Sequence, residues 1–357
     1  MEWVKRGVLA LRSLSALHVV CAPLLRIYSA TEGRQHAGAL GVGDPPQHAF
    51  ATISVNAFRE IRIGACPIVI AHRGDSFHAP ENTLEAAILG QQSGAFAWEL
   101  DVHLSRDGVP VVIHDDSLTR TTNVSERFEG DSRARDGFRV ADFSWEEIHE
   151  LDAGSWFVNP AGGARTAVDF GTYEELSEAG RRRFASGQIR IPSLIEALRL
   201  TKELNWMVNV ELKTFPEADR GLLAAVFDDI RRIEMADRVL ISSFDHDEVA
   251  LAVKLRPEVA CGALCHTPLR RSSAYVRDLV GADFFHTSAE ALGSVSRNYR
   301  QYPSAASLRA IDLEEPRIPT FVYTVNDARP HGLAAHLEAR GAAGIFSDNP
   351  GALVKIW

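Results

Sequence analysis

The 357-residue chain has few cysteines and lacks a long apolar run. Its four cysteines are scattered, and only Cys261 and Cys265 lie close together in the sequence. This spacing falls short of a zinc site, and the cysteine count excludes a disulfide-rich secreted domain. No stretch reaches the roughly 18 consecutive apolar residues of a membrane-spanning helix. We therefore expect no integral membrane span.

An excess of positive charge is also lacking, because the formal net charge is −9. Nucleic-acid binding calls for a basic face, so this balance argues against that function. The composition, 46% hydrophobic and 24% charged, is that of an ordinary globular protein with one large domain or two small ones. We expect a small-molecule partner and no nucleic acid, and the sequence leaves the oligomeric state open.

The N-terminal residues lack a clear targeting signal. Lys5 and Arg6 precede an apolar segment, but Arg12 interrupts it and no convincing cleavage site follows. A degenerate signal peptide, an organelle transit segment and an over-long start all stay open. We treat residues 1–61 as an N-terminal extension, poorly ordered or targeting, and residues 62–357 as the folded domain. We expect a cytoplasmic protein, with export or transit as the alternative.

Beyond residue 62, short apolar runs alternate with helix-length amphipathic segments. Ser193 and Glu196 have the spacing of a capping box at the start of one such helix. Eight strands alternating with helices predict a parallel (β/α)8 TIM barrel, with an open doubly wound sheet as the alternative. The predicted strands are Ile68–Ala71, Ala97–Val102, Met207–Leu212, Arg238–Ser242, Ala260–Leu264, Asp283–His286, Thr320–Val325 and Gly344–Ser347.

One connection is too short to hold a helix. Asp107-Gly108, soon after the second predicted strand, is a strong signal for a two-residue hairpin. Pairing outward from this turn places His114 opposite Asp101. The residues from about 115 to 190 then form an insertion after the second barrel strand, before the next helix.

Acidic residues gather where the predicted strands end, which is the functional face of such a barrel. Glu99 and Asp101 are two apart on one strand and share a face, and Glu211 and Lys213 have the same spacing. If these strands are neighbours, three carboxylates converge, and a hard divalent cation with oxygen ligands fits them. The alternative is a salt-bridge network with Arg73 and Lys213.

Two histidines come from separate segments that both end at this face. His72 follows the first strand, and His114 ends the hairpin. Two imidazoles flanking a phosphodiester suit paired proton transfer, one to the leaving alkoxide and one from the nucleophile. Arg73 and Lys213 can bind the phosphate oxygens. The residues alone therefore predict metal-dependent phosphodiester hydrolysis.

These motifs, in this order, resemble those of the glycerophosphodiester phosphodiesterase family. Its signature of HR, E-x-D and H is matched by His72-Arg73, Glu99 with Asp101, and His114. RIPSLIEAL, VNVELK, ISSF, YTVND and GIFSDNP are similar too, so the resemblance runs from about Pro67 to the C-terminus. It implies a (β/α)8 barrel with an insertion after the second strand. It also implies conversion of a glycerophosphodiester and water to glycerol 3-phosphate and an alcohol.

The resemblance assigns roles residue by residue. It makes His72 and His114 the acid/base pair, and it makes Arg73 and Lys213 the phosphate contacts. The implied cofactor is one divalent cation, Mg²⁺ or Ca²⁺, with three ligands: Glu99, Asp101 and Glu211. Four further residues are candidates for the pocket: Glu81, Asn82, Phe244 and Tyr323.

Some of these interpretations have alternatives. Asn82 or Thr83 can instead cap the following helix, and Phe244 and Tyr323 can instead pack in the core. Many relatives carry Trp at the position of Tyr323, so the leaving-alcohol pocket can differ here. The alternative activities are those of a lysophospholipase D or a phosphoinositide-type phosphodiesterase on the same barrel. A catalytically inactive barrel that serves as a binding protein is the rival from another class.

Overall fold

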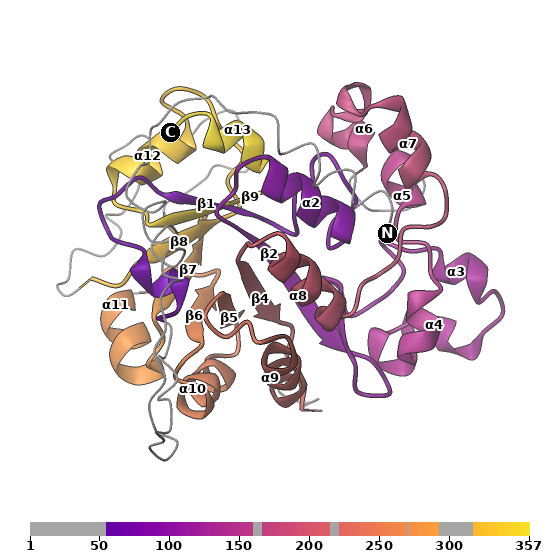
Figure 1. The fold of residues 1–357 in the computed structure, drawn as a ribbon, viewed down its shortest axis with the longest axis horizontal. Coiled ribbons are helices and arrows are strands. Elements are labelled where there is room, and N and C mark those ends of the chain that lie inside the picture. The colour runs from indigo at the N-terminus through magenta and orange to yellow at the C-terminus, as the bar shows by residue number, and fades with distance from the viewer. Residues whose placement is uncertain (1–54, 160–165, 215–220, 270, 293–316) are drawn as a thin grey trace, which may run out of the picture. The chain divides into compact units, whose positions relative to one another are not determined.

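The computed structural model describes residues 55–159, 166–214, 221–269, 271–292 and 317–357. Residues 1–54, most of the predicted N-terminal extension, lie outside these ranges. Within them, eight parallel strands surround a common interior, and β1 pairs with both β2 and β9 (Figure 1). These two pairings close the sheet into a ring. The predicted (β/α)8 barrel is therefore confirmed, and the open doubly wound sheet is wrong.

Each predicted strand overlaps an observed one, with ends that differ by a few residues. An antiparallel strand, β3 (Pro110–Val112), pairs with β2 outside the ring. The barrel strands are β1 (Ile68–Ala71), β2 (Ala97–Leu104), β4 (Val208–Leu212), β5 (Val239–Ser243), β6 (Ala260–Cys265), β7 (Phe284–Ser288), β8 (Thr320–Tyr323) and β9 (Gly344–Ser347).

Helices connect most of the strands and cover the outside of the barrel (Figure 1). The predicted capping box of α8 is confirmed, because the backbone N of Ser193 donates to Glu196 Oε2 at 2.8 Å. The covering helices are α2 (Leu84–Gln92), α8 (Leu194–Glu203), α9 (Leu222–Ile233), α10 (His246–Leu255), α11 (Ser272–Ala274) with η6 (Tyr275–Val280), α12 (Leu333–Ala339) and α13 (Pro350–Val354).

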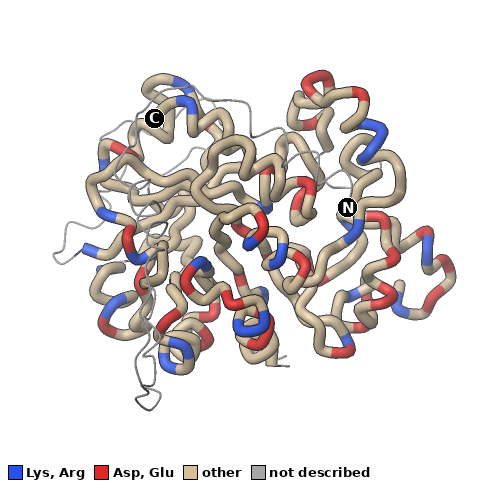
Figure 2. The backbone as a smooth tube through the Cα atoms, in the orientation of Figure 1, with Lys and Arg blue, Asp and Glu red and all other residues tan. Residues whose placement is uncertain are grey.

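The surface charges of the described residues are mixed in sign. Lys and Arg alternate with Asp and Glu along the outer helices and the insertion (Figure 2). Salt bridges between close neighbours, such as Arg231 with Asp228 on α9, reflect this pattern. No helix in the described part of the chain is long and apolar enough to cross a membrane.

The N-terminal end of the barrel is closed by a short 3₁₀ helix, η1 (Ala57–Glu60). Phe58 is fully buried among barrel-interior side chains, where its ring meets Phe96 edge to face. Asn56 Nδ2 donates to the carbonyl of Val239 at 2.8 Å, at the start of β5. Residues 56–61, which lie before the predicted domain start at residue 62, therefore pack against the barrel.

The hairpin forms as predicted, but its register differs by one residue. Leu104 lies opposite Pro110, and Val102 lies opposite Val112. The backbone N of Ile113 donates to the carbonyl of Asp101 at 3.0 Å. Ile113, and not His114, is therefore the residue opposite Asp101, so the predicted pairing was wrong.

The length of the turn explains this shift. The backbone N of Ser105 donates to the carbonyl of Val109 at 2.9 Å, so the loop contains three residues and not two. Gly108 takes the left-handed conformation with φ of 84°, as three-residue hairpin loops require. The Ser105 hydroxyl also accepts from the Val109 N, which favours the longer loop. Ser105 was not part of the sequence argument.

The predicted insertion after the second barrel strand is confirmed, and it gathers on one side of the barrel (Figure 1). It contains its own hydrophobic cluster, in which Phe143 and Phe157 are fully buried. Arg183 Nη2 donates to Glu85 Oε1 at 2.8 Å and so ties it to α2. Its elements are α3 (Val124–Arg127), η2 (Ser132–Asp136), η3 (Val140–Asp142), α4 (Trp145–His149), α5 (Ser155–Val158), α6 (Ala167–Phe170), η4 (Tyr173–Glu175) and α7 (Glu178–Phe184).

Candidate active site

A cavity of about 140 Å³ opens at the C-terminal ends of the barrel strands. Most of the predicted site residues line it. Glu81, Asn82 and Asp101 are the exceptions. The lining residues are His72, Arg73, Glu99, His114, Asn209, Glu211, Lys213, Phe244, Leu264, Tyr323, Thr324 and Phe346.

The three predicted carboxylates converge beside this cavity. Asp101 on β2 lies directly across from Glu211 on β4, and Glu99 shares the inner face of β2 with Asp101. Each residue offers a carboxylate oxygen, and these oxygens all lie within 4.8 Å of one another. All three side chains are buried. The strand-pairing condition on which the sequence argument depended is therefore met.

Burial and mutual repulsion act strongly on this triad. Burial raises the pKa of Glu99, and the charges of Asp101 and Glu211 raise it further. Burial also raises the pKa of Glu211. Burial would raise the pKa of Asp101 too, but the charges of Lys213 and Arg73 hold it well below its usual range. The neighbouring cations thus lower the pKa of Asp101 but do not offset the rise at Glu99 and Glu211.

The predicted salt-bridge alternative is also present in part. Lys213 Nζ lies 2.8 Å from Asp101 Oδ1 and also contacts Glu211 Oε1, while Arg73 Nε lies 3.5 Å from Asp101 Oδ2. None of these ion pairs includes Glu99. Glu99 Oε1 is buried and accepts no hydrogen bond from any described residue.

The composition of the triad fits a divalent cation. A buried carboxylate oxygen without a partner is costly, and a cation bound beside it would remove that cost. The three groups supply oxygen donors alone, which suit hard cations such as Mg²⁺ or Ca²⁺. Glu99, Asp101 and Glu211 are therefore the residues that could hold such an ion.

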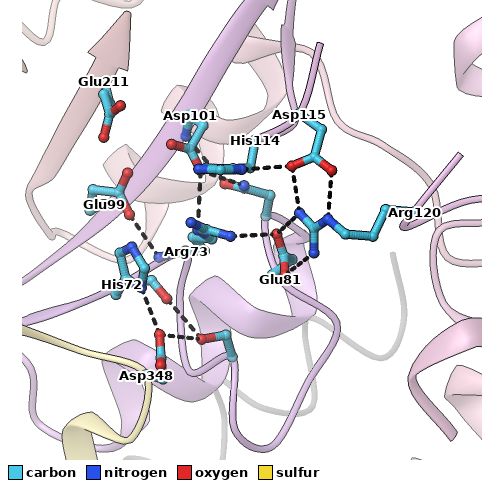
Figure 3. Close-up of polar contacts among 12 residues, drawn as sticks. His72, Arg73, Glu81, Glu99, Asp101, His114, Asp115, Arg120, Glu211 and Asp348 are labelled. Carbon is cyan, nitrogen blue, oxygen red and sulfur yellow. Dashed lines mark hydrogen bonds and ion pairs between the residues drawn. The ribbon is translucent and has the colours of Figure 1, made fainter. Parts of the chain in front are cut away.

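His72 is held from behind by a residue at the end of β9. Its Nδ1 lies 2.6 Å from Asp348 Oδ1 (Figure 3). Asn326 Nδ2 donates to Asp348 Oδ2 at 2.7 Å. Burial would raise the pKa of Asp348, but His72 and Asn326 lower it to about 2. An ionised Asp348 accepts the Nδ1 proton of His72, which leaves Nε2 for a substrate.

His114 has a matching carboxylate in the next residue along the chain. Its Nδ1 lies 2.7 Å from Asp115 Oδ1. Arg120 donates to Asp115 from Nε at 2.6 Å and from Nη2 at 2.9 Å (Figure 3). Burial would raise the pKa of Asp115, but its bonds to His114 and Arg120 hold it below the usual range. Both histidines therefore have Nδ1 bound and Nε2 available.

Arg73 and its neighbours link the loop after β1 to the triad. The backbone N of Arg73 donates to Glu99 Oε2 at 2.9 Å, and its Nη1 donates to Glu81 Oε1 at 2.9 Å. Burial opposes its charge, but Glu81, Asp101 and Glu99 raise the pKa of Arg73. Arg73 has φ of 58°, and this left-handed turn directs its backbone N–H at Glu99.

Asn82 contacts the triad and does not cap the following helix. Its Nδ2 donates to Asp101 Oδ2 at 2.8 Å, and its Oδ1 accepts from the Asp101 N at 3.2 Å. Thr83 caps α2 instead, since its hydroxyl accepts from the Ala86 N at 3.2 Å. Of the two open interpretations of Asn82, the structure supports the contact with the site.

Apart from Asn209 and Thr324, the remaining residues that line the cavity are aromatic or aliphatic. Phe244, at the end of β5, is 44% exposed, so packing in the core does not explain it. Its ring meets that of Tyr323 edge to face, with centroids 6.2 Å apart. Leu264 and Phe346 complete this wall. The cavity thus has a charged side and an aromatic side.

Sequence reasoning did not assign roles to Asp348, Asn326, Asp115 or Arg120. Asp348 directly follows β9, so the rule that located the other strand-end groups could have found it. Asp115 adjoins His114, which was a weaker signal. Arg120 lies in the insertion with no local pattern, and only the folded chain brings it to Asp115 and Glu81.

Comparisons with known proteins agree with this site. The model of the glycerophosphoryl diester phosphodiesterase family matches residues 72–352, from the first site histidine into α13. A glycerophosphodiester phosphodiesterase of Bacillus altitudinis is 30% identical over 289 residues, which are 81% of this chain and 97% of that protein. A shorter match is the mouse glycerophosphoinositol inositolphosphodiesterase GDPD2, 38% identical over 42% of this chain but only 25% of that protein.

A solved structure is similar over the same region. An Oleispira antarctica phosphodiesterase, in complex with its product sn-glycerol 3-phosphate, superposes with a TM-score of 0.61 and 27% identity. The match covers 82% of this chain and 96% of that one. With a family match over most of its length, the chain belongs to the glycerophosphoryl diester phosphodiesterase family and is an enzyme of the phosphoric diester hydrolase class.

Proposed function

We propose that the enzyme hydrolyses glycerophosphodiesters to glycerol 3-phosphate and an alcohol, with the help of one divalent cation. One observation carries this proposal. Two histidines, each bound at Nδ1 by a carboxylate, line a single cavity together with two members of a buried carboxylate triad. The named activities of the Bacillus altitudinis relative and the product in the Oleispira antarctica structure support the same substrate class.

His72 and His114 serve as the proton carriers. A histidine that donates from Nδ1 to a carboxylate can accept a proton at Nε2, and the carboxylate stabilises the charged ring that results. One histidine takes the proton of the nucleophile, either water or the glycerol 2-hydroxyl, as its oxygen bonds to phosphorus. The other gives a proton to the departing alkoxide. Attack by the 2-hydroxyl gives a cyclic phosphate, which water then opens to glycerol 3-phosphate with the two histidines in exchanged roles. Asp348 and Asp115 keep the two rings in the orientation that this exchange needs.

Arg73 and Lys213 bind the phosphate oxygens. Both line the cavity, and the surrounding carboxylates raise the pKa of each, so both stay charged at neutral pH. Glu99, Asp101 and Glu211 would hold the cation, Mg²⁺ or Ca²⁺. When bound, a divalent cation there supplies positive charge that polarises a phosphate or hydroxyl oxygen.

The test is release of glycerol 3-phosphate from glycerophosphocholine, with a panel of divalent cations and with excess chelator. We expect Glu99→Gln to raise the cation concentration needed for half-maximal rate, because it removes a ligand charge. Glu203→Gln, an exposed change on α8, is the matched control. Full activity in excess chelator would remove the cation from the scheme, and no release under any condition would refute the function.

The alternative is a lysophospholipase D or a phosphoinositide-type phosphodiesterase. The half-exposed Phe244 on the aromatic wall favours a substrate with an apolar group, and the mouse relative is named for glycerophosphoinositol. Parallel assays on glycerophosphocholine, lysophosphatidylcholine and glycerophosphoinositol distinguish these activities. We expect the highest kcat/KM for glycerophosphocholine. A preference for lysophosphatidylcholine would establish the lysophospholipase D alternative, and a preference for glycerophosphoinositol would establish the phosphoinositide-type alternative.

A further inference from the structure

Arg120 bridges two carboxylates that come from different parts of the fold. It follows the hairpin at the start of the insertion, and its side chain is only 25% exposed. It binds Asp115 through Nε and Nη2, at 2.6 and 2.9 Å. It binds Glu81, in the loop before α2, through Nη1 and Nη2 at 2.9 and 2.8 Å. One planar guanidinium thus makes four hydrogen bonds (Figure 3).

Each of these carboxylates contacts a different residue of the cavity wall. Asp115 binds His114 Nδ1, and Glu81 binds Arg73 Nη1. Arg120 itself does not line the cavity. The same side chain therefore lies behind the proposed proton carrier on one side and the proposed phosphate ligand on the other.

The arrangement depends on the shape of the guanidinium as well as its charge. Asp115 and Glu81 are both acidic, and without a cation between them they would repel each other. A flat group with five N–H donors can bind both carboxylates in a fixed geometry, whereas an ammonium group is a single charge on a flexible stem. Burial would raise the pKa of Glu81, but Arg73 and Arg120 lower it to about 2, so it remains an acceptor for both.

We propose that Arg120 is a positioning residue for the reaction, acting through Asp115 on His114 and through Glu81 on Arg73. The proposal rests on the proposed function of these two cavity residues. It assigns to the insertion a part in the chemistry, because Arg120 lies in that segment and not in the barrel. Loss of Arg120 should disturb proton transfer, seen in kcat, and phosphate binding, seen in KM.

The first experiment compares Arg120→Ala with Arg133→Ala. Arg133 is a matched control in the same insertion: it binds Asp131 through Nε and Nη2, contacts Glu147, and is 20% exposed. None of its partners lines the cavity. We expect Arg120→Ala to lower kcat/KM about 10- to 100-fold, as loss of an outer partner of a functional group does. Arg133→Ala should lower the melting temperature but change kcat and KM less than about twofold.

Two further measurements separate positioning from simple stabilisation. Arg120→Lys keeps the charge without the planar fork, so it should recover the melting temperature but not kcat. Guanidinium ion at millimolar concentration should restore part of the activity of Arg120→Ala and leave Arg133→Ala unchanged. Full recovery of kcat by Arg120→Lys would overturn the proposal, since charge alone would then suffice.

Double variants test the two connections one at a time. In an Asp115→Asn background, Arg120→Ala should lower kcat little further but should still raise KM. In a Glu81→Gln background, it should raise KM little further but should still lower kcat. Equal losses in both backgrounds, or kinetic constants like those of Arg133→Ala, would overturn the positioning role.

A binding measurement separates failure of this proposal from failure of the proposed function. If the wild-type protein releases no glycerol 3-phosphate, the proposed function fails, but calorimetry with inorganic phosphate still reports on Arg73. Arg120→Ala should then weaken phosphate binding about tenfold, and Arg133→Ala should not. Equal affinities in the wild type and Arg120→Ala would overturn the connection through Glu81.

Discussion

The two histidines of the site are held by different kinds of structure. His72 follows β1 and Asp348 follows β9, and these strands are paired, with Ala71 opposite Ser347. His114 and Asp115 are neighbours in the chain beyond β3, and Arg120 donates two side-chain hydrogen bonds to Asp115. The His72–Asp348 pair thus follows two strands of the barrel itself, whereas the His114–Asp115 pair lies in the segment that leads from the hairpin into the insertion.

This difference shows in exposure. The side chains of His72 and Asp348 are 17% and 15% exposed, whereas those of His114 and Asp115 are 34% and 27% exposed. Backbone ladders fix a strand end through many bonds at once, while an ion pair near solvent adds little by itself. We therefore expect the position of His114 and Asp115 to change more readily than that of His72 and Asp348, without a change in the barrel strands.

The largest expected effect on activity comes from removing either histidine, which tests whether both are needed for turnover. His72→Ala and His114→Ala should each lower kcat by about 10² to 10⁴-fold, because each removes one of the proposed proton carriers. Circular dichroism and the melting temperature should stay close to those of the wild type. His336→Ala on α12 is the control. A wild-type rate in either variant would remove that histidine from the mechanism.

A smaller effect should separate the two carboxylates. Asp348→Asn should lower kcat about 10- to 100-fold, because the amide no longer fixes the His72 tautomer. Asp115→Asn should cost less, since water can reach the more exposed His114 and replace the lost acceptor. The measurement is kcat at saturating glycerophosphocholine, with Asp228→Asn on α9 as the surface control. The opposite order would mean that the insertion side carries the stricter geometry.

Acid should lower the free energy of unfolding of the barrel, because His286 on β7 is buried in its neutral form. Its ring stacks on Phe321 with centroids 5.1 Å apart, and neither ring nitrogen has a hydrogen-bond partner among the described residues. Burial lowers the pKa of His286 to about 3 from 6.5, so the unfolded chain binds the extra proton between these pH values. This contribution to stability is complete above pH 6.5 and is lost as the pH falls towards 3, by at most about 1.4 kcal/mol per pH unit.

Urea unfolding at pH 7.5 and pH 5 checks this expectation. The wild type should lose more stability between these conditions than His286→Leu, which has no group to protonate. His336→Ala should behave like the wild type. Parallel losses in wild type and His286→Leu would show that His286 is not the group responsible.

The smallest expected effect lies in the hairpin that joins the two sides. A Cβ at Gly108 would meet no atom within 4 Å, so Gly108→Ala costs only the left-handed backbone, about 1 kcal/mol of unfolding free energy. Gly108→Asn should cost less, because Asn tolerates this conformation better. Both variants should keep kcat, and a large loss of kcat would show that the turn itself sets the position of His114.

The sequence was informative wherever one rule acts at many positions. Alternating strands and helices predicted the barrel, and the strand-end rule located His72, Glu99 and Glu211 before any contact was known. Two carboxylates spaced two apart had to share a face, so the triad needed only that β2 and β4 be neighbours. Local periodicity carries this information, and the fold preserves it.

The rest depended on contacts between distant residues or on fine details of a turn. His72 and Asp348 are 276 positions apart in the sequence, although their side chains are in contact. No local sequence pattern links Arg120 to Glu81. The predicted hairpin register was wrong by one residue, because Asp107-Gly108 was interpreted as a two-residue turn. The hydroxyl of Ser105 stabilises a three-residue loop, and turn signals alone do not separate these lengths.

The short helix η1, at the N-terminal end of the barrel, limits how far the chain can be shortened from its N-terminus without loss of stability. Phe58 is fully buried and plugs the N-terminal end of the barrel interior. Asn56, 1% exposed, donates to the carbonyl of Val239 beside it. A shortened version that begins at Arg62 would lose this plug and open the apolar floor to water, at a cost of about 2 kcal/mol or more for Phe58 alone. Fusion partners and protease sites therefore belong upstream of Asn56.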